Sequence, residues 1–108
     1  MTETFEALAG LDKRVHEPAR LAILTALSVC SSADFLFLRR LTGLTKGNLA
    51  THLSKLEKTG LVEIEKRFVG KKPNTLVSLT SEGRAAIEHH WRQLEELQKR
   101  AQQWQPER

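Results

Sequence analysis

The chain has a single cysteine, Cys30, and no stretch that approaches the roughly 20 apolar residues of a membrane-spanning helix. One cysteine cannot form a disulfide within the chain, which agrees with a reducing compartment. The first six residues contain neither a basic nor an apolar segment of the kind that makes a secretion signal. The sequence therefore predicts a cytoplasmic protein without a membrane partner. Nothing around Cys30 suggests an activated thiol, so we expect a small buried side chain rather than a redox switch.

Motifs of catalysis and of metal binding are also missing. The chain has no glycine-rich phosphate loop, no His-Glu-x-x-His pattern and no nucleophile elbow. Its four histidines are scattered, and only His89 and His90 are adjacent. Neighbours on a helix point about 100° apart and rarely bind one ion, so exposed helix histidines are the simpler interpretation, although two copies could meet across a dimer. The sequence predicts no enzyme, no metal site and no cofactor.

What the chain does contain is a concentration of positive charge near its middle. Its 108 residues, 40% hydrophobic and 28% charged, suit one globular domain with a modest core. Of the net charge of +4, residues 39–72 hold nine bases and three acids, a charge of +6, and the rest hold eight bases and ten acids, a charge of −2. Such a segment favours a polyanionic partner, although basic runs often only keep a surface hydrated.

The hydrophobic pattern predicts three helices in the first part of the chain, over residues 4–11, 18–29 and 35–41. The first would place Phe5 and Leu8 on one side. Pro18 is well placed in the first turn of the second helix, and Asp34 is a plausible N-cap for the third. Between these two helices, residues 31–33 form a break. The third helix offers a broad apolar face, Leu36, Phe37, Leu38 and Leu41.

A turn at Gly43 leads into a fourth predicted helix, over residues 46–59. Thr45 is its natural N-cap, and Gly60 ends it. At 100° per residue, three leucines fall within about 60° of one another and must face the core. These are Leu49, Leu53 and Leu56.

The opposite face of this helix is small and polar at first and then basic. Asn and Thr can read base edges in a major groove, and Gly lets the backbone approach closely. We therefore expect base contacts from Gly47, Asn48, Thr51 and Ser54. A merely hydrated helix surface would more often carry Glu and Lys pairs four residues apart, but this contrast alone does not exclude that explanation.

Two short strands around a basic turn come next. Residues 61–69 alternate apolar and charged side chains, residues 70–74 form the turn, and residues 75–79 return. Directly after the polar helix, this hairpin would act as a wing that reaches phosphates or a minor groove. A lysine-rich hairpin tip is also a common protection against aggregation. The expected contacts to the DNA backbone are Thr45, Lys46, Lys55, Lys58, Arg67, Lys71 and Lys72.

The last predicted helix, over residues 81–104 with Thr80 as N-cap, is the longest. At 1.5 Å per residue it would extend about 35 Å, which outreaches so small a core. We expect its distal apolar stripe to pair with a second copy of the chain, although the first helix of the same chain could also cover it. The predicted dimer interface comprises Phe5, Leu8, Trp91, Leu94, Leu97, Ala101 and Trp104.

Together these elements predict a mainly α fold with a small β-hairpin, a winged helix-turn-helix with a long C-terminal dimerisation helix. A single domain would span residues 1–108, with the winged-helix core over 16–80 and the C-terminal helix over 81–105. Five segments resemble the small winged-helix transcriptional regulators related to the MarR and ArsR groups: residues 16–24, 41–49, 52–57, 60–62 and 79–84.

That resemblance implies a homodimer that binds double-stranded DNA at a pseudo-palindromic operator, usually as a repressor. It also implies that residues 46–59 form the recognition helix and residues 67–74 the wing. The cysteine-containing motif of ArsR-type metal sensors is missing, and the residues point to no particular small-molecule effector. The alternative is a winged-helix module that docks on an acidic protein partner.

Overall fold

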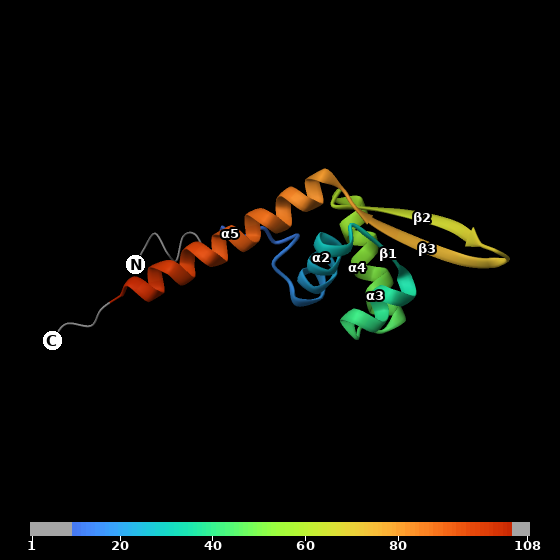
Figure 1. Ribbon diagram of the computed structural model, residues 1–108, viewed down its shortest axis with the longest axis horizontal. Helices are drawn as coiled ribbons and strands as arrows, with labels where there is room; N and C mark the ends of the chain where they lie inside the picture. Colours follow the sequence, from blue (N-terminus) through green and yellow to red (C-terminus); the bar gives the residue numbers. More distant parts are fainter. Residues whose placement is uncertain (1–9, 105–108) are drawn as a thin grey trace.

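The computed structural model describes residues 10–104, so most of the helix predicted over residues 4–11, with Phe5 and Leu8, lies outside the described residues. The elements in chain order are α2 (Pro18–Cys30), β1 (Ser32–Asp34), α3 (Phe35–Thr42), α4 (Lys46–Lys58), β2 (Val62–Val69), β3 (Lys72–Leu79) and α5 (Ser81–Gln103). Helices α2, α3 and α4 form a compact body, from which the β2–β3 hairpin extends on one side and α5 on the other (Figure 1). Within residues 10–104, none of the helices combines the length and the apolar composition needed to cross a membrane.

The core lies where α2, α3, α4, the sheet and the start of α5 meet. The three leucines of α4 were predicted to face inward, and Leu49, Leu53 and Leu56 are indeed buried. They pack with Ile23, Leu24 and Leu27 of α2, Leu38 of α3 and Ile87 of α5. Burying one such side chain contributes about 1.5–3 kcal/mol, so these contacts fix which side of α4 remains outside.

The sheet has three strands rather than the predicted two. Residues 31–33 were predicted to be only a break, but β1 pairs antiparallel with β3, with Ser32 opposite Ser78 and Asp34 opposite Leu76. The sheet order is β1-β3-β2. A strand of three residues is too short to show a hydrophobic period, and its pairing depends on a partner more than forty positions away.

The turn of the hairpin is also tighter than predicted. Pairing of Val69 with Lys72 leaves Gly70 and Lys71 as a two-residue loop, so the prediction of a turn over residues 70–74 is wrong. Gly70 has φ +64°, which such loops require and which glycine adopts without strain. Pro73 was thought to belong to the turn, but it lies in β3, beyond the segment that pairs with β1, where a third strand does not need its missing N–H.

Helix α3 is less buried than its composition predicted. Only Leu38 is fully buried, whereas Leu36, Phe37 and Leu41 are each about half exposed. An eight-residue helix that packs along one side covers little more than one position per turn. Apart from Leu38, the apolar residues of the face predicted for residues 35–41 are therefore open to solvent.

Two single residues also differ from prediction. Cys30 is exposed at the last position of α2, rather than buried, because the inward-facing positions of α2 end at Leu27. His90 is fully buried, rather than exposed, because it lies three residues after Ile87 on the same side of α5. Its ring centroid is 5.3 Å from that of His16. His89 is exposed, as predicted.

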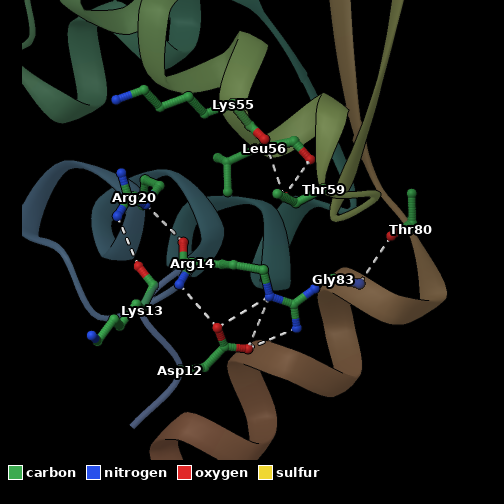
Figure 2. Close-up of polar contacts among 9 residues, drawn as sticks. All are labelled: Asp12, Lys13, Arg14, Arg20, Lys55, Leu56, Thr59, Thr80 and Gly83. Atoms are coloured by element: carbon green, nitrogen blue, oxygen red, sulfur yellow. Dashed lines mark hydrogen bonds and ion pairs between the residues drawn. The ribbon is translucent and has the colours of Figure 1, made fainter.

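The junction between the hairpin and α5 is tightly built. The Thr80 side chain caps α5 by accepting a 2.9 Å hydrogen bond from the Gly83 N–H (Figure 2). The Thr80 hydroxyl in turn donates to the Gly60 carbonyl at 2.7 Å, just past the end of α4. A Cβ at Gly83 would collide with the Leu61 carbonyl, so only glycine allows α5 to start this close to the chain that leaves α4.

Candidate nucleic-acid interface

Helix α4 presents its predicted polar face to solvent. The Thr45 hydroxyl accepts a 3.1 Å hydrogen bond from the Asn48 N–H, which confirms Thr45 as the N-cap. The Thr51 hydroxyl donates to the Gly47 carbonyl at 2.9 Å and keeps its acceptor lone pairs available. The exposed residues of this face are Thr45, Lys46, Gly47, Asn48, Thr51, Ser54, Lys55 and Lys58.

Gly47 has no structural purpose within the described part of the chain. A Cβ at this position would meet nothing within 4 Å, and its φ is not in the left-handed region. Glycine within a helix costs up to about 1 kcal/mol relative to alanine. The fold thus gives no reason for glycine here, whereas close approach of a partner to the start of α4 would.

The wing carries its basic side chains in the open. Arg67 lies opposite Asn74 in the register, and its Nε donates to the Asn74 side-chain oxygen at 3.0 Å. Lys71 occupies the loop and Lys72 the first position of β3, and both are exposed. Two apolar residues next to the loop, Phe68 and Val69, are exposed as well. The tip therefore offers both cations and apolar surface.

Charges on this side of the molecule are unpaired. Within residues 10–104, none of the lysines of α4 or basic residues of the wing takes part in an ion pair with a carboxylate. Helix α5, in contrast, carries pairs four residues apart, such as Glu95 with Lys99 at 3.6 Å, as expected of a hydrated helix surface. The comparison within one chain separates the exposed face of α4 from an ordinary solvated face.

Carboxylates are gathered elsewhere. Four of them line a separate hollow of about 780 Å³ between β2 and the start of α5: Glu57, Glu63, Glu65 and Glu82. Of these four, only Glu57 belongs to α4, where it precedes Lys58, and none lies in the hairpin loop at Gly70 and Lys71. An approaching polyanion would therefore meet cations first.

A polar contact joins the start of α2 to α4. The Glu17 carboxylate caps α2 by accepting from the Arg20 N–H at 2.8 Å, and it lies 3.6 Å from His52 Nδ1 of α4. Burial alone would raise the pKa of Glu17, but the backbone N–H groups of Arg20 and Ala19 and the charge of His52 hold that pKa below its ordinary value. Glu17 therefore stays ionised next to His52 of α4.

The apolar stripe of α5 runs from the body into solvent. Trp91 is 44% exposed and Trp104 is 70% exposed, whereas Leu94 and Leu97 are half-buried and Ala101 is exposed. Figure 1 shows α5 extending well past the helical body. Large exposed aromatics along one stripe are typical of a surface that is covered by another chain.

Basic residues outside the central segment were missed from the sequence. Lys13, Arg14 and Arg20 lie beside the last turns of α4 and share a hollow with Lys55 and Lys58. The pair Lys13-Arg14 is visible in the sequence, but its distance of about forty residues from Lys55 hid the connection, which only the packing of α2 on α4 creates.

Helix, polar-faced helix and basic hairpin define a winged helix-turn-helix, and residues 19–98 match the family described as the winged helix DNA-binding domain. The chain belongs to this family. An uncharacterized protein of Methanocaldococcus jannaschii is 35% identical over 79 residues, which cover 73% of this chain and 83% of that protein.

Solved structures agree with this assignment. The transcriptional regulator homologue from Pyrococcus horikoshii OT3 has a TM-score of 0.80 at 28% identity and covers 92% of this chain and 96% of its own. A mutant of MarR from E. coli has a TM-score of 0.72 at 23% identity, over 92% of this chain and 71% of its own. The predicted resemblance to the MarR group is confirmed, and the family and fold are those of transcription regulators rather than enzymes.

Proposed function

We propose that the chain binds double-stranded DNA sequence-specifically, as a homodimer on a pseudo-palindromic operator, and that it acts in the cytoplasm as a repressor. The observation that carries this proposal is the outer face of α4, which is polar, contains an otherwise unneeded glycine and is flanked by unpaired cations. In winged helices this face enters a major groove.

The contacts divide into two kinds. Base reading is assigned to Gly47, Asn48, Thr51 and Ser54, and backbone contact to Thr45, Lys46, Lys55, Lys58, Arg67, Lys71 and Lys72. Asn can bond adenine with both its amide atoms, and Thr can bond a base or touch a thymine methyl group. Lysine and arginine neutralise phosphates and set the salt dependence of binding.

Dimerisation is assigned to the distal part of α5, together with the segment that contains Phe5 and Leu8. Trp91, Leu94, Leu97, Ala101 and Trp104 would form its apolar stripe, with residues 16–80 as the DNA-reading core of a single domain over 1–108. Two copies related by a two-fold axis would present their α4 helices to successive major grooves, about 34–36 Å apart.

Selection of bound sites from random duplex, combined with a measurement of mass in solution, tests this proposal. The expected result is an enriched sequence with two inverted half-sites about 10 base pairs apart, bound by a species of twice the chain mass. A monomer at micromolar concentration, or uniform recovery of all sequences, would contradict it. Uniform weak recovery together with capture by an acidic protein would favour the interaction module instead.

A further inference from the structure

A second basic surface lies next to the proposed DNA-reading face. It is a hollow of about 400 Å³ between residues 10–17, the first turn of α2 and the last two turns of α4, and we name it the basic cleft. Five of its lining residues are basic and none is acidic: Lys13, Arg14, Arg20, Lys55 and Lys58. Two segments that are distant in sequence, residues 13–20 and 55–58, thus contribute five basic residues to one hollow.

Arg20 holds this arrangement in position. Its side chain is 16% exposed, and its guanidinium donates from Nε to the Arg14 carbonyl at 2.7 Å and from Nη2 to the Lys13 carbonyl at 2.8 Å. These bonds fix the backbone of residues 13 and 14 against α2. In Figure 2 the charged ends of Lys13, Arg20 and Lys55 follow one another along the same side.

The nearby acids leave three lysines uncompensated. Asp12 is bound by Arg14 at 2.7 Å, and hydrogen bonds from Arg14 hold the pKa of Asp12 below its ordinary value. Glu17 lies 3.9 Å from Arg20 and is shared with His52. Within residues 10–104, Lys13, Lys55 and Lys58 make no ion pair. Like charges that line one hollow repel one another, so the cleft favours an anion.

The remaining lining selects for charge rather than shape. Leu56 contributes no polar side-chain atom, and the Thr59 hydroxyl already donates to the carbonyls of Lys55 and Leu56, at 3.1 and 3.2 Å. The rim lysines are mobile point charges, which suit a phosphate group. The two planar guanidinium groups of the lining are already engaged, that of Arg14 by Asp12 and that of Arg20 by the carbonyls of Lys13 and Arg14.

We propose that the basic cleft binds a phosphate group. Lys55 and Lys58 belong both to the cleft and to the exposed side of α4, so a phosphate held there lies beside any duplex that α4 reads. The source is then the DNA backbone or a free phosphate. If the phosphate belongs to the DNA backbone, the inference rests on the proposed function. The DNA-contacting surface then also includes Lys13, which lies outside the helix-turn-helix and the wing.

Substitution of Lys13 tests whether the cleft binds a phosphate of the DNA backbone. Lys13 is exposed and its side chain makes no hydrogen bond among the described residues, so Lys13→Ala and Lys13→Glu should leave the thermal transition unchanged. We expect several-fold weaker duplex binding for Lys13→Ala and a greater loss for Lys13→Glu. The slope of log affinity against log salt should fall by about 0.9 per cleft. Lys99→Ala, which removes one exposed charge from α5, is the matched control and should change neither quantity.

Titration of the full chain with inorganic phosphate, without DNA, tests whether the cleft binds free phosphate. Free phosphate is the ligand if the Lys55 and Thr59 amide signals shift saturably and the shifts disappear in Lys13→Glu. In that case the slope of log duplex affinity against log salt should be the same in wild type and in the Lys13 variants. A reduced slope without saturable shifts would identify the backbone. An unchanged slope together with no saturable shift would overturn the inference. If wild-type protein binds no duplex, the proposed function fails, while the phosphate titration still decides about the cleft.

Discussion

At the scale of single residues, the positions that say most about function are those that the fold does not explain. Gly47 serves no internal packing, and the ring of His90 is buried although neither of its nitrogens finds a hydrogen-bond partner among the described residues. A buried polar group without a partner costs about 1–3 kcal/mol. Both residues therefore lower the stability of the folded chain and can be tested by the gain that follows their replacement.

Gly47→Ala should separate stability from binding. Alanine fits without contact at this position and reduces the freedom of the unfolded chain, so the free energy of unfolding should rise by about 0.5–1 kcal/mol. Duplex binding should weaken, since the added methyl group meets the base edges that α4 approaches. Chemical denaturation and duplex titration measure the two effects. Higher stability with unchanged affinity would remove Gly47 from the interface.

His90→Leu should both stabilise the fold and flatten its response to pH. Burial, and next the charge of His16, lower the pKa of His90 below the ordinary 6.5, with a smaller opposing effect from Asp12. The unfolded chain therefore takes up a proton first as the pH falls. The free energy of unfolding is therefore highest above about pH 6.5 and decreases as the pH drops toward the lower pKa of His90 in the folded chain. Urea denaturation at about pH 7.5 and about pH 5.5, on either side of that ordinary value, should show this loss in wild type and a smaller one in His90→Leu. An equal loss in both proteins would exclude His90 as its source.

At the scale of elements, α4 is suited to contacts that depend on the DNA sequence and the wing to contacts that do not. Helix α4 holds hydrogen-bonding side chains, whereas the two-residue loop of the wing holds a lysine beside exposed Phe68 and Val69. Loss of wing cations should therefore act alike on every sequence, and loss of an α4 side chain should act on one base position.

The double substitution Lys71→Ala/Lys72→Ala should weaken binding to all duplexes and flatten its salt dependence, with a slope lower by about 0.9 for each phosphate that is no longer neutralised. Asn48→Ala should instead relax the preference at one position, at a cost of about 1–3 kcal/mol for the preferred base. Titrations of a selected and a scrambled duplex at several salt concentrations measure both. Unchanged affinity of the wing variant across salt would contradict its role.

The elements themselves could largely be predicted from the sequence because they depend on local signals. N-caps at Asp34, Thr45 and Thr80 and the leucine spacing of α4 placed three helices to within a residue or two. What depended on distant partners could not be predicted. Strand β1 exists only through β3, and the basic cleft exists only because α2 packs on α4. The apolar face of α3 could be predicted, but not its exposure, because the sequence shows which side of a helix is apolar and not whether another element covers it.

At the scale of the whole molecule, the winged-helix body and the distal end of α5 are separate surfaces. The body presents cations and polar side chains, whereas exposed tryptophans lie at Trp91 in the middle of α5 and at Trp104 just past its end. A protein that reads two half-sites needs both surfaces on one chain, so that assembly doubles the DNA-reading surface without hiding any of it.

Trp104→Ala should weaken the dimer without loosening the fold. Trp104 is 70% exposed and lies just past the end of α5, so its removal leaves the core intact, whereas an aromatic at the centre of an interface commonly contributes about 2 kcal/mol or more. Sedimentation should show dissociation at concentrations where wild type stays dimeric, and duplex affinity should fall with it. Gln98→Ala, at another exposed position of α5, is the control. Unchanged mass would place the interface elsewhere.

The continuous course of α5 has a mechanical consequence. Its first turn is fastened through Thr80 to Gly60, directly behind α4, and about 30 Å of unbroken helix separates Gly83 from Gln103 at 1.5 Å per residue. In the proposed dimer, where the far ends of two α5 helices would be joined, a rotation of α5 about that end would displace α4. One degree of rotation about that end carries α4 by about 0.5 Å, as follows from that length. A change of a few degrees in the angle at which two α5 helices cross would then shift each α4 by about 1–2 Å relative to the groove it enters.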